Sequence, residues 1–119
     1  MGPHEVVGVD VRGNQIMAHA FRGRDDRLFA MLGVMTPCCG ASGKGLMDEP
    51  SGQGFIGCRK CYSEVDPLHG DAWTWDEDLD APVKWDRIAR DLFDGNLEKV
   101  AGVAQSVKAL MDRAEQRGI

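Results

Sequence analysis

The sequence has no apolar run long enough to cross a membrane, which excludes a protein built on membrane-spanning helices. Such a helix needs about 20 consecutive apolar residues, and no stretch of the 119-residue chain approaches that length. The first ten residues also lack the basic flank and apolar centre of a signal peptide. We therefore expect a soluble, cytoplasmic protein without membrane partners.

Basic residues are also fewer than acidic residues, with 14 Lys and Arg against 19 Asp and Glu. The net charge is -5 at pH 7, which argues against general phosphate neutralisation of nucleic acid, because that mode needs a surplus of Lys and Arg. Residues 64–82 carry seven acidic side chains and no basic one, whereas 1–63 and 83–119 each carry seven basic and six acidic side chains. All of the net negative charge therefore lies in one middle segment.

Aromatic residues make up only 7% of the chain, while glycine is frequent, with 15 residues. This composition predicts a modest core with many loops, for which a metal or covalent staple would add stability. A chain of this length has room for one compact domain. Within it we distinguish segments 1–35, 36–65, 66–82 and 83–119.

The residue pattern predicts an α+β fold that begins with a β-hairpin. Valines alternate with small or polar residues on both sides of the turn-forming triplet at 12–14. Apolar residues then recur at helical spacing over 25–35, which predicts a short helix. Segment 66–82 has no clear period and is expected to be an acidic, Trp-containing loop.

Segment 83–119 predicts two amphipathic helices. Their apolar stripes are interrupted by Asp94, Gly95 and Asn96, and Asn96 is a good N-cap for the second helix. Because the connection is short, we expect an antiparallel helical hairpin.

All four cysteines lie within residues 36–63, at Cys38, Cys39, Cys58 and Cys61. In a reducing compartment, cysteines at this spacing are more often metal ligands than disulfides. The second pair flanks a two-residue turn, so both thiols can reach one ion at a metal–sulfur distance of about 2.3 Å. We expect one zinc ion per chain, because four ligands suit its tetrahedral geometry.

The stretch TPCCGASG resembles the knuckle of rubredoxin-type and zinc-ribbon proteins, Cys-Pro-x-Cys-Gly-x-x-Gly. Four residues match that pattern: Pro37, Cys39, Gly40 and Gly43. Thr36 stands where the family has its first Cys, and Cys38 fills the variable position. The resemblance covers residues 36–65 and implies a zinc ribbon with a structural metal, of the kind that contacts DNA, RNA or a partner protein in transcription.

Three uses of the cysteines remain open. The simplest is a four-cysteine site, in which the adjacent Cys38 and Cys39 both bind because the backbone curls around the ion. The second combines three cysteines with His69, eight residues beyond Cys61. The third is a redox dithiol of Cys58 and Cys61, which the lack of a βαβ context disfavours. Four unliganded thiols are disfavoured by the compact spacing.

Two enzymatic motifs, those of the zinc deaminases and of the phosphate loop, do not match the sequence at the required spacing. The zinc deaminases need His-x-Glu and Pro-Cys-x-x-Cys, but His4 and Glu5 are adjacent, and no proline precedes Cys58. A phosphate loop needs Ser or Thr after its lysine, and Lys44 is followed by Gly45. We therefore expect a non-enzymatic protein whose metal serves folding.

Binding is then the expected activity, most directly in transcription or DNA transactions. The candidate nucleic-acid or partner contacts are Lys44, Arg59, Lys60 and Tyr62. One alternative is a protein-binding regulator, such as a phage-type inhibitor, which docks an acidic, aromatic strip on a basic partner. That strip comprises Trp73, Trp75, Asp76, Glu77, Asp78 and Asp80, although its two tryptophans would equally serve to anchor a solvated loop to the core. A zinc or dithiol enzyme is the third class.

The choice between Arg and Lys, and between Asp and Glu, indicates the base composition of the source genome. Arg exceeds Lys by 9 to 5 and Asp exceeds Glu by 13 to 6. This bias is typical of a GC-rich genome, such as that of an actinobacterium or its phage.

Overall fold

The computed structural model describes residues 4–23, 25–76 and 81–118. Its elements are β1 (His4–Val9), β2 (Gln15–Arg22), β3 (Leu28–Val34), β4 (Gly43–Asp48), β5 (Gln53–Cys58), the 3-10 turn η1 (Pro67–Gly70), β6 (Trp73–Asp76), α1 (Ala81–Leu92) and α2 (Leu97–Gln116). Four strands form one sheet in the order β1-β2-β3-β6, and β4 pairs with β5 in a separate two-stranded ribbon. The fold is α+β, as predicted.

The predicted N-terminal β-hairpin is confirmed. Strands β1 and β2 pair antiparallel, and the turn between them is closed by the buried Asp10. Its carboxylate accepts hydrogen bonds from the backbone N–H groups of Arg12 at 2.9 Å and Asn14 at 2.8 Å. Gly13 supplies the left-handed backbone of the turn, with φ 86°.

The predicted helix over 25–35 is wrong, because Leu28–Val34 forms strand β3. In this strand Ala30, Leu32 and Val34 are buried, and the residues between them are only partly buried, which is the period of two that a strand requires. The strand pairs with β2 on one side and with β6 on the other. A short apolar run fits either period, and here the two neighbouring strands decide the outcome.

The segment expected to be a loop contains both η1 and β6. In β6, Trp73 and Trp75 are 1% and 2% exposed. The Trp73 indole N–H donates to Asp91 of α1 at 3.0 Å, and the guanidinium of Arg87 lies 5.5 Å from the centre of the ring. These two tryptophans are therefore core residues, and β6 docks α1 on the sheet.

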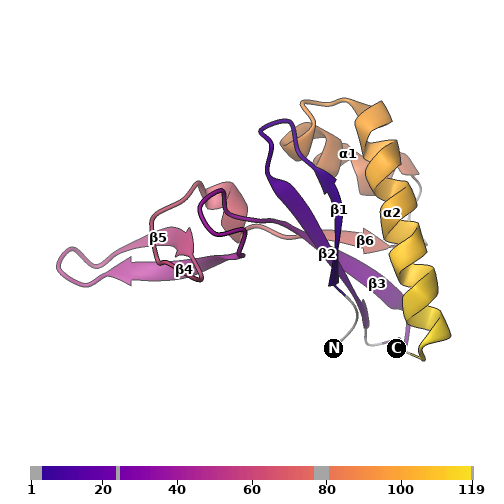
Figure 1. The fold of residues 1–119 in the computed structure, drawn as a ribbon, viewed down its shortest axis with the longest axis horizontal. Helices are drawn as coiled ribbons and strands as arrows, with labels where there is room; N and C mark the ends of the chain where they lie inside the picture. The colour runs from indigo at the N-terminus through magenta and orange to yellow at the C-terminus, as the bar shows by residue number, and fades with distance from the viewer. Residues whose placement is uncertain (1–3, 24, 77–80, 119) are drawn as a thin grey trace.

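Both helices cover one face of the sheet (Figure 1). Helix α2 contacts β1, β2 and β3, while α1 contacts β6. The core lies between the layers and combines alternate strand residues with the apolar stripes of both helices. No helix in the described part of the chain is long and apolar enough to cross a membrane.

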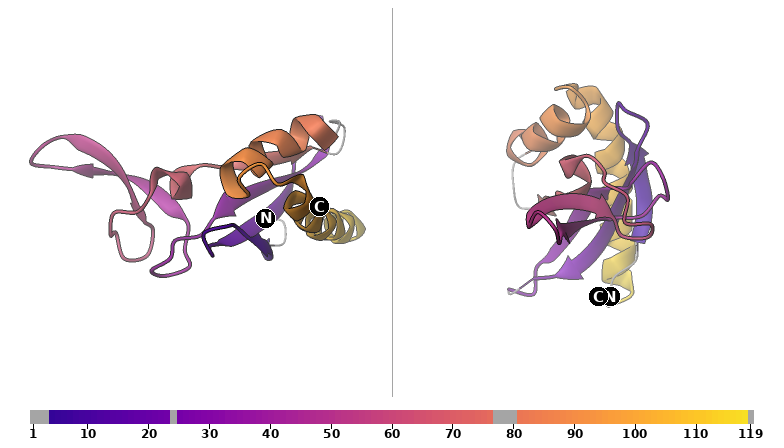
Figure 2. Two further views of the ribbon diagram at one scale, coloured as in Figure 1. Left: turned by 90° about the horizontal axis from the view of Figure 1, so that it is seen from above. Right: turned by 90° about the vertical axis from the view of Figure 1, so that its left-hand side faces the viewer.

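The predicted break between the helices is confirmed. Gly95 has a φ of 83°, and the Asn96 side chain accepts hydrogen bonds from the N–H groups of Glu98 and Lys99 at 3.0 and 3.4 Å. The antiparallel helical hairpin is not confirmed. The axes of α1 and α2 cross rather than run side by side, as Figure 1 and the view from above in Figure 2 show.

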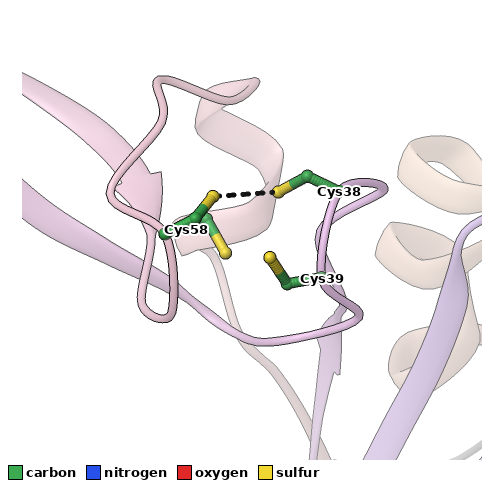
Figure 3. Close-up of side chains that lie close together, drawn as sticks. Cys38, Cys39 and Cys58 are labelled. Atoms are coloured by element: carbon green, nitrogen blue, oxygen red, sulfur yellow. Dashed lines mark hydrogen bonds between the residues drawn. The ribbon is translucent and has the colours of Figure 1, made fainter.

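The ribbon β4–β5 projects from the two-layer body (Figure 1), which gives the molecule extents of 47 × 31 × 22 Å. Among the described elements, the ribbon meets the body at its base through η1, which contacts β3, β4 and β5. The approach is close enough that a Cβ on Gly43 would overlap the carbonyl of His69. The cysteine turns lie at this same base (Figure 3).

We predict that Leu110→Ala lowers the free energy of unfolding by about 2–5 kcal/mol, because it leaves a cavity under α2. Leu110 is fully buried in the core. The measurement is urea denaturation, with Lys108→Ala at an exposed position of the same helix as control. A loss equal to that of the control would contradict the packing of α2 on the sheet.

Candidate metal centre

The four cysteine sulfurs gather at one point. The Sγ atoms of Cys38, Cys39, Cys58 and Cys61 all lie within 4.8 Å of one another. Cys38, Cys39 and Cys61 are exposed, whereas Cys58 is buried. The sulfurs of Cys38 and Cys61 are 3.6 Å apart. The side chains of Cys38, Cys39 and Cys58 point toward a common centre (Figure 3). Four sulfurs around one tetrahedral ion at about 2.3 Å are separated by roughly 3.8 Å, so the cluster fits a metal ion.

Two backbone turns of the same kind carry these cysteines. In the first turn, the N–H of Gly40 donates to the carbonyl of Thr36 at 2.9 Å, and in the second the N–H of Tyr62 donates to the carbonyl of Cys58 at 2.8 Å. Gly40 and Tyr62 are both left-handed, with φ values of 61° and 63°. Thr36 therefore corresponds to Cys58, and Gly40 to Tyr62.

A second pair of hydrogen bonds extends the match. The N–H of Thr36 donates to Ala41 at 2.7 Å, and the N–H of Cys58 donates to Ser63 at 2.9 Å. Cys39 therefore corresponds to Cys61. Thr36 occupies the place of a first knuckle cysteine, and Cys38 brings the fourth sulfur to the cluster from the position between.

Thr36 is the site residue whose role the sequence did not reveal. Its side chain is buried, and its hydroxyl oxygen lies 3.3 Å from the sulfur of Cys58. This hydroxyl is the main cause that lowers the Cys58 pKa from 9.0 to about 6, followed by the backbone N–H of Cys61, while burial opposes the change. The thiolate, which is the form that binds metals, is thereby favoured.

The other sulfurs show how closely the thiols interact. The hydrogen bond between the Cys61 sulfur and the Ser63 side chain is the main cause that lowers the Cys61 pKa. The pKa of Cys39 is instead raised to about 12, chiefly because its thiol is hydrogen-bonded to Cys61. Like charges this close cannot all form without a compensating cation. The donor set therefore suits a positive ion at its centre.

His69 is not brought into the cluster. Its ring is buried, and Nδ1 lies 3.2 Å from the carbonyl of Val34, so its contact is with the end of β3. Among the described residues, the group of His, Cys, Asp and Glu that can hold an ion consists of the four cysteines.

The predicted contact residues around the metal centre are exposed. Lys44 lies on β4, and Arg59, Lys60 and Tyr62 lie within the second turn. The Nε of Arg59 donates to the Ser42 hydroxyl at 2.9 Å, which ties the second turn to the first.

The structure does not show the predicted acidic, aromatic strip as a surface, because its tryptophans are buried and most of its acidic residues lie outside the described residues. Trp73 and Trp75 are buried and so are not available as surface contacts. Asp76 is described only as the last residue of β6, and Glu77, Asp78 and Asp80 lie outside the described residues.

We predict that Thr36→Val makes the protein release a bound divalent metal at a higher pH than the wild type. The substitution removes the hydroxyl that lowers the Cys58 pKa, so protons compete for this sulfur at a higher pH. Acid titration of the Co²⁺-loaded protein, followed by its thiolate absorbance, measures the midpoint. Thr36→Ser is the control and should behave like the wild type, and equal midpoints for all three proteins would contradict this role.

Comparison with known proteins provides no family for the chain. No family model matches it, and no curated protein or solved structure matches it either. The likeness to a zinc knuckle therefore depends on the geometry of the cysteine turns.

Proposed function

We propose that this is a non-enzymatic structural-zinc protein that acts by binding another protein. The observation that carries the proposal is the convergence of four cysteine sulfurs from two matched turns. Thiolates are soft ligands that select zinc among the common divalent ions of a reducing compartment. Zinc accepts four of them in a closed tetrahedron, and residues 36–65 would then form a zinc ribbon.

The four-sulfur site supports a structural role. A catalytic zinc keeps one position open for water or substrate, and here a fourth sulfur is available to fill it. The ribbon also has a clear need for the ion, because an isolated two-stranded hairpin is marginally stable in water. Bound zinc would supply charge compensation for the thiolates and fasten the base of the ribbon to the body.

The projecting ribbon is the surface that we assign to binding. It extends beyond the body (Figure 1) and carries exposed side chains of both signs, with Lys44 beside the metal turns and Asp48 and Glu49 at its tip. Mixed charge on a chain of net charge -5 suits a protein partner better than a phosphate backbone. A setting in transcription is part of the proposal and follows from the resemblance to zinc ribbons.

Nucleic acid is the second candidate partner. Arg59, Lys60 and Tyr62 are exposed on one turn, where two cations and an aromatic ring could contact a phosphate and stack on a base.

Purified protein should contain about one zinc per chain. Cys38→Ser, Cys39→Ser, Cys58→Ser and Cys61→Ser should each lose zinc and the protease resistance of the ribbon, because metal binding is coupled to folding. Mass spectrometry under native conditions and limited proteolysis make the two measurements. His69→Gln, which alters the histidine outside the cluster, should keep the zinc. A zinc-loaded Cys38→Ser variant would refute the four-cysteine site.

The double variant Thr36→Cys with Cys38→Ser tests the equivalence of the two turns. It moves one sulfur to the position that corresponds to Cys58, so it should bind one zinc per chain while Cys38→Ser does not. Zinc stoichiometry is again the readout. Failure of the double variant to recover zinc would contradict the matched geometry.

At physiological salt we expect no saturable binding of single-stranded DNA, since few cations on the ribbon can release counterions. A gel-shift series over a range of salt concentrations provides the measurement. If binding is seen, Arg59→Glu with Lys60→Glu identifies its source, and Lys99→Glu with Lys108→Glu on α2 is the control of equal charge change. Loss in the first variant and retention in the second would favour nucleic acid as the partner.

A further inference from the structure

Tyr62 occupies a backbone position that suits glycine. The corresponding residue of the first turn is Gly40, and both have φ near 60°. A residue with a bulky side chain is strained in this left-handed region, whereas glycine is not. Tyr62 is also 60% exposed, so burial of its ring offsets little of that strain. Its side chain therefore contributes little to folding, which indicates a role in contacts outside the chain.

Tyr62 is one of the residues that line a shallow cavity on one face of the ribbon. The cavity has a volume of about 370 Å³ and is lined by Asp48, Gln53, Gly54, Phe55, Tyr62 and Glu64. That volume is the size of a side chain rather than of a single water molecule. A ligand group can therefore enter it.

Three chain segments meet at Gly57 to form this face. An ideal Cβ on Gly57 would lie 3.3 Å from the Phe55 ring and 3.3 Å from the Tyr62 carbonyl oxygen. Glu64 pairs with Gly57 in an antiparallel bridge. Directly opposed residues share a face in such a pair, as do residues two apart on one strand. The Glu64 side chain therefore stands on the same face as Phe55.

The lining residues favour a cation. They include two aromatic rings and two carboxylates and no Lys, Arg or His. Asp48 accepts a hydrogen bond from the Ser51 hydroxyl at 2.7 Å. In the described part of the chain, no hydrogen bond or ion pair engages the Glu64 carboxylate. Lys44 pairs with Gly57 across β4 and β5 and therefore shares this face of the ribbon, but it does not line the cavity.

We propose that this cavity binds the guanidinium group of an arginine side chain on a partner protein. Aromatic faces and carboxylates both attract a cation, and they repel a phosphate. Guanidinium is preferred to the lysine ammonium because it is less strongly hydrated, stacks on aromatic rings and pairs in a fork with carboxylates. The proposal rests on the structural-zinc function, since zinc would hold the ribbon that forms the cavity.

The test is an NMR titration of the zinc-loaded full-length protein with N-acetylarginine methylamide. The matched probes are the corresponding lysine and norleucine compounds. Arginine should give saturable amide shifts confined to the cavity residues, and norleucine should give none. Glu64→Gln should weaken arginine binding by up to about fivefold, which is the upper range for an exposed ion pair. Glu49→Gln makes the same charge change at an exposed position that does not line the cavity, and it should leave the affinity unchanged.

Tyr62→Gly separates binding from folding. It should weaken arginine binding about fivefold and leave the zinc content unchanged. Its thermal midpoint should be equal to or above that of the wild type, because glycine accepts the left-handed backbone without strain. A merely structural role for Tyr62 would instead lower the midpoint and leave the affinity as it was.

Several results would overturn the site. These are the absence of saturable shifts with arginine, equal affinity in the wild type and both cavity variants, and tighter binding of lysine or norleucine than of arginine. Zinc content is measured in the same samples. A chain without zinc refutes the structural-zinc function, whereas a zinc-loaded chain that does not bind arginine refutes the cavity proposal alone.

Discussion

The convergence of the four cysteine sulfurs supports a part of the chain that has few other contacts. The body has its own core, in which two helices pack on one face of a four-stranded sheet. Among the described elements, the ribbon β4–β5 contacts that body at its base through η1, and two strands alone are marginally stable. An ion bound by the cysteines would therefore stabilise the ribbon, whose two strands would otherwise fray.

The two turns reach this convergence by different means. Their backbones make the same hydrogen bonds, yet the first turn has Thr36 where the second has Cys58. The hydroxyl of Thr36 contacts the sulfur at the corresponding position, while Cys38 supplies the remaining thiol. The Thr36 side chain thus favours the thiolate form of Cys58, and the cluster still contains four sulfurs.

The cysteine turns also determine which side chains line one face of the ribbon. The second turn places Tyr62 in a left-handed conformation, and the antiparallel bridge between Gly57 and Glu64 places a carboxylate nearby. Aromatic and acidic groups then line one cavity, although Asp48 lies at the end of β4 whereas Tyr62 and Glu64 follow β5. This arrangement favours a cationic group over the phosphate that Arg59 and Lys60 alone would attract.

Local patterns in the sequence were enough to predict the N-terminal hairpin, the helix break at Gly95 and Asn96, and the grouping of the cysteines, because turns, caps and short ligand spacings involve neighbouring residues. They were not enough for β3, since an apolar run of this length fits a strand or a helix until β2 and β6 pair with it. Tertiary structure alone decided that Trp73 and Trp75 are core residues, that His69 contacts Val34 and that Thr36 contacts Cys58. Each of these results depends on residues far apart in the chain, whose approach is set by strand pairing and core packing.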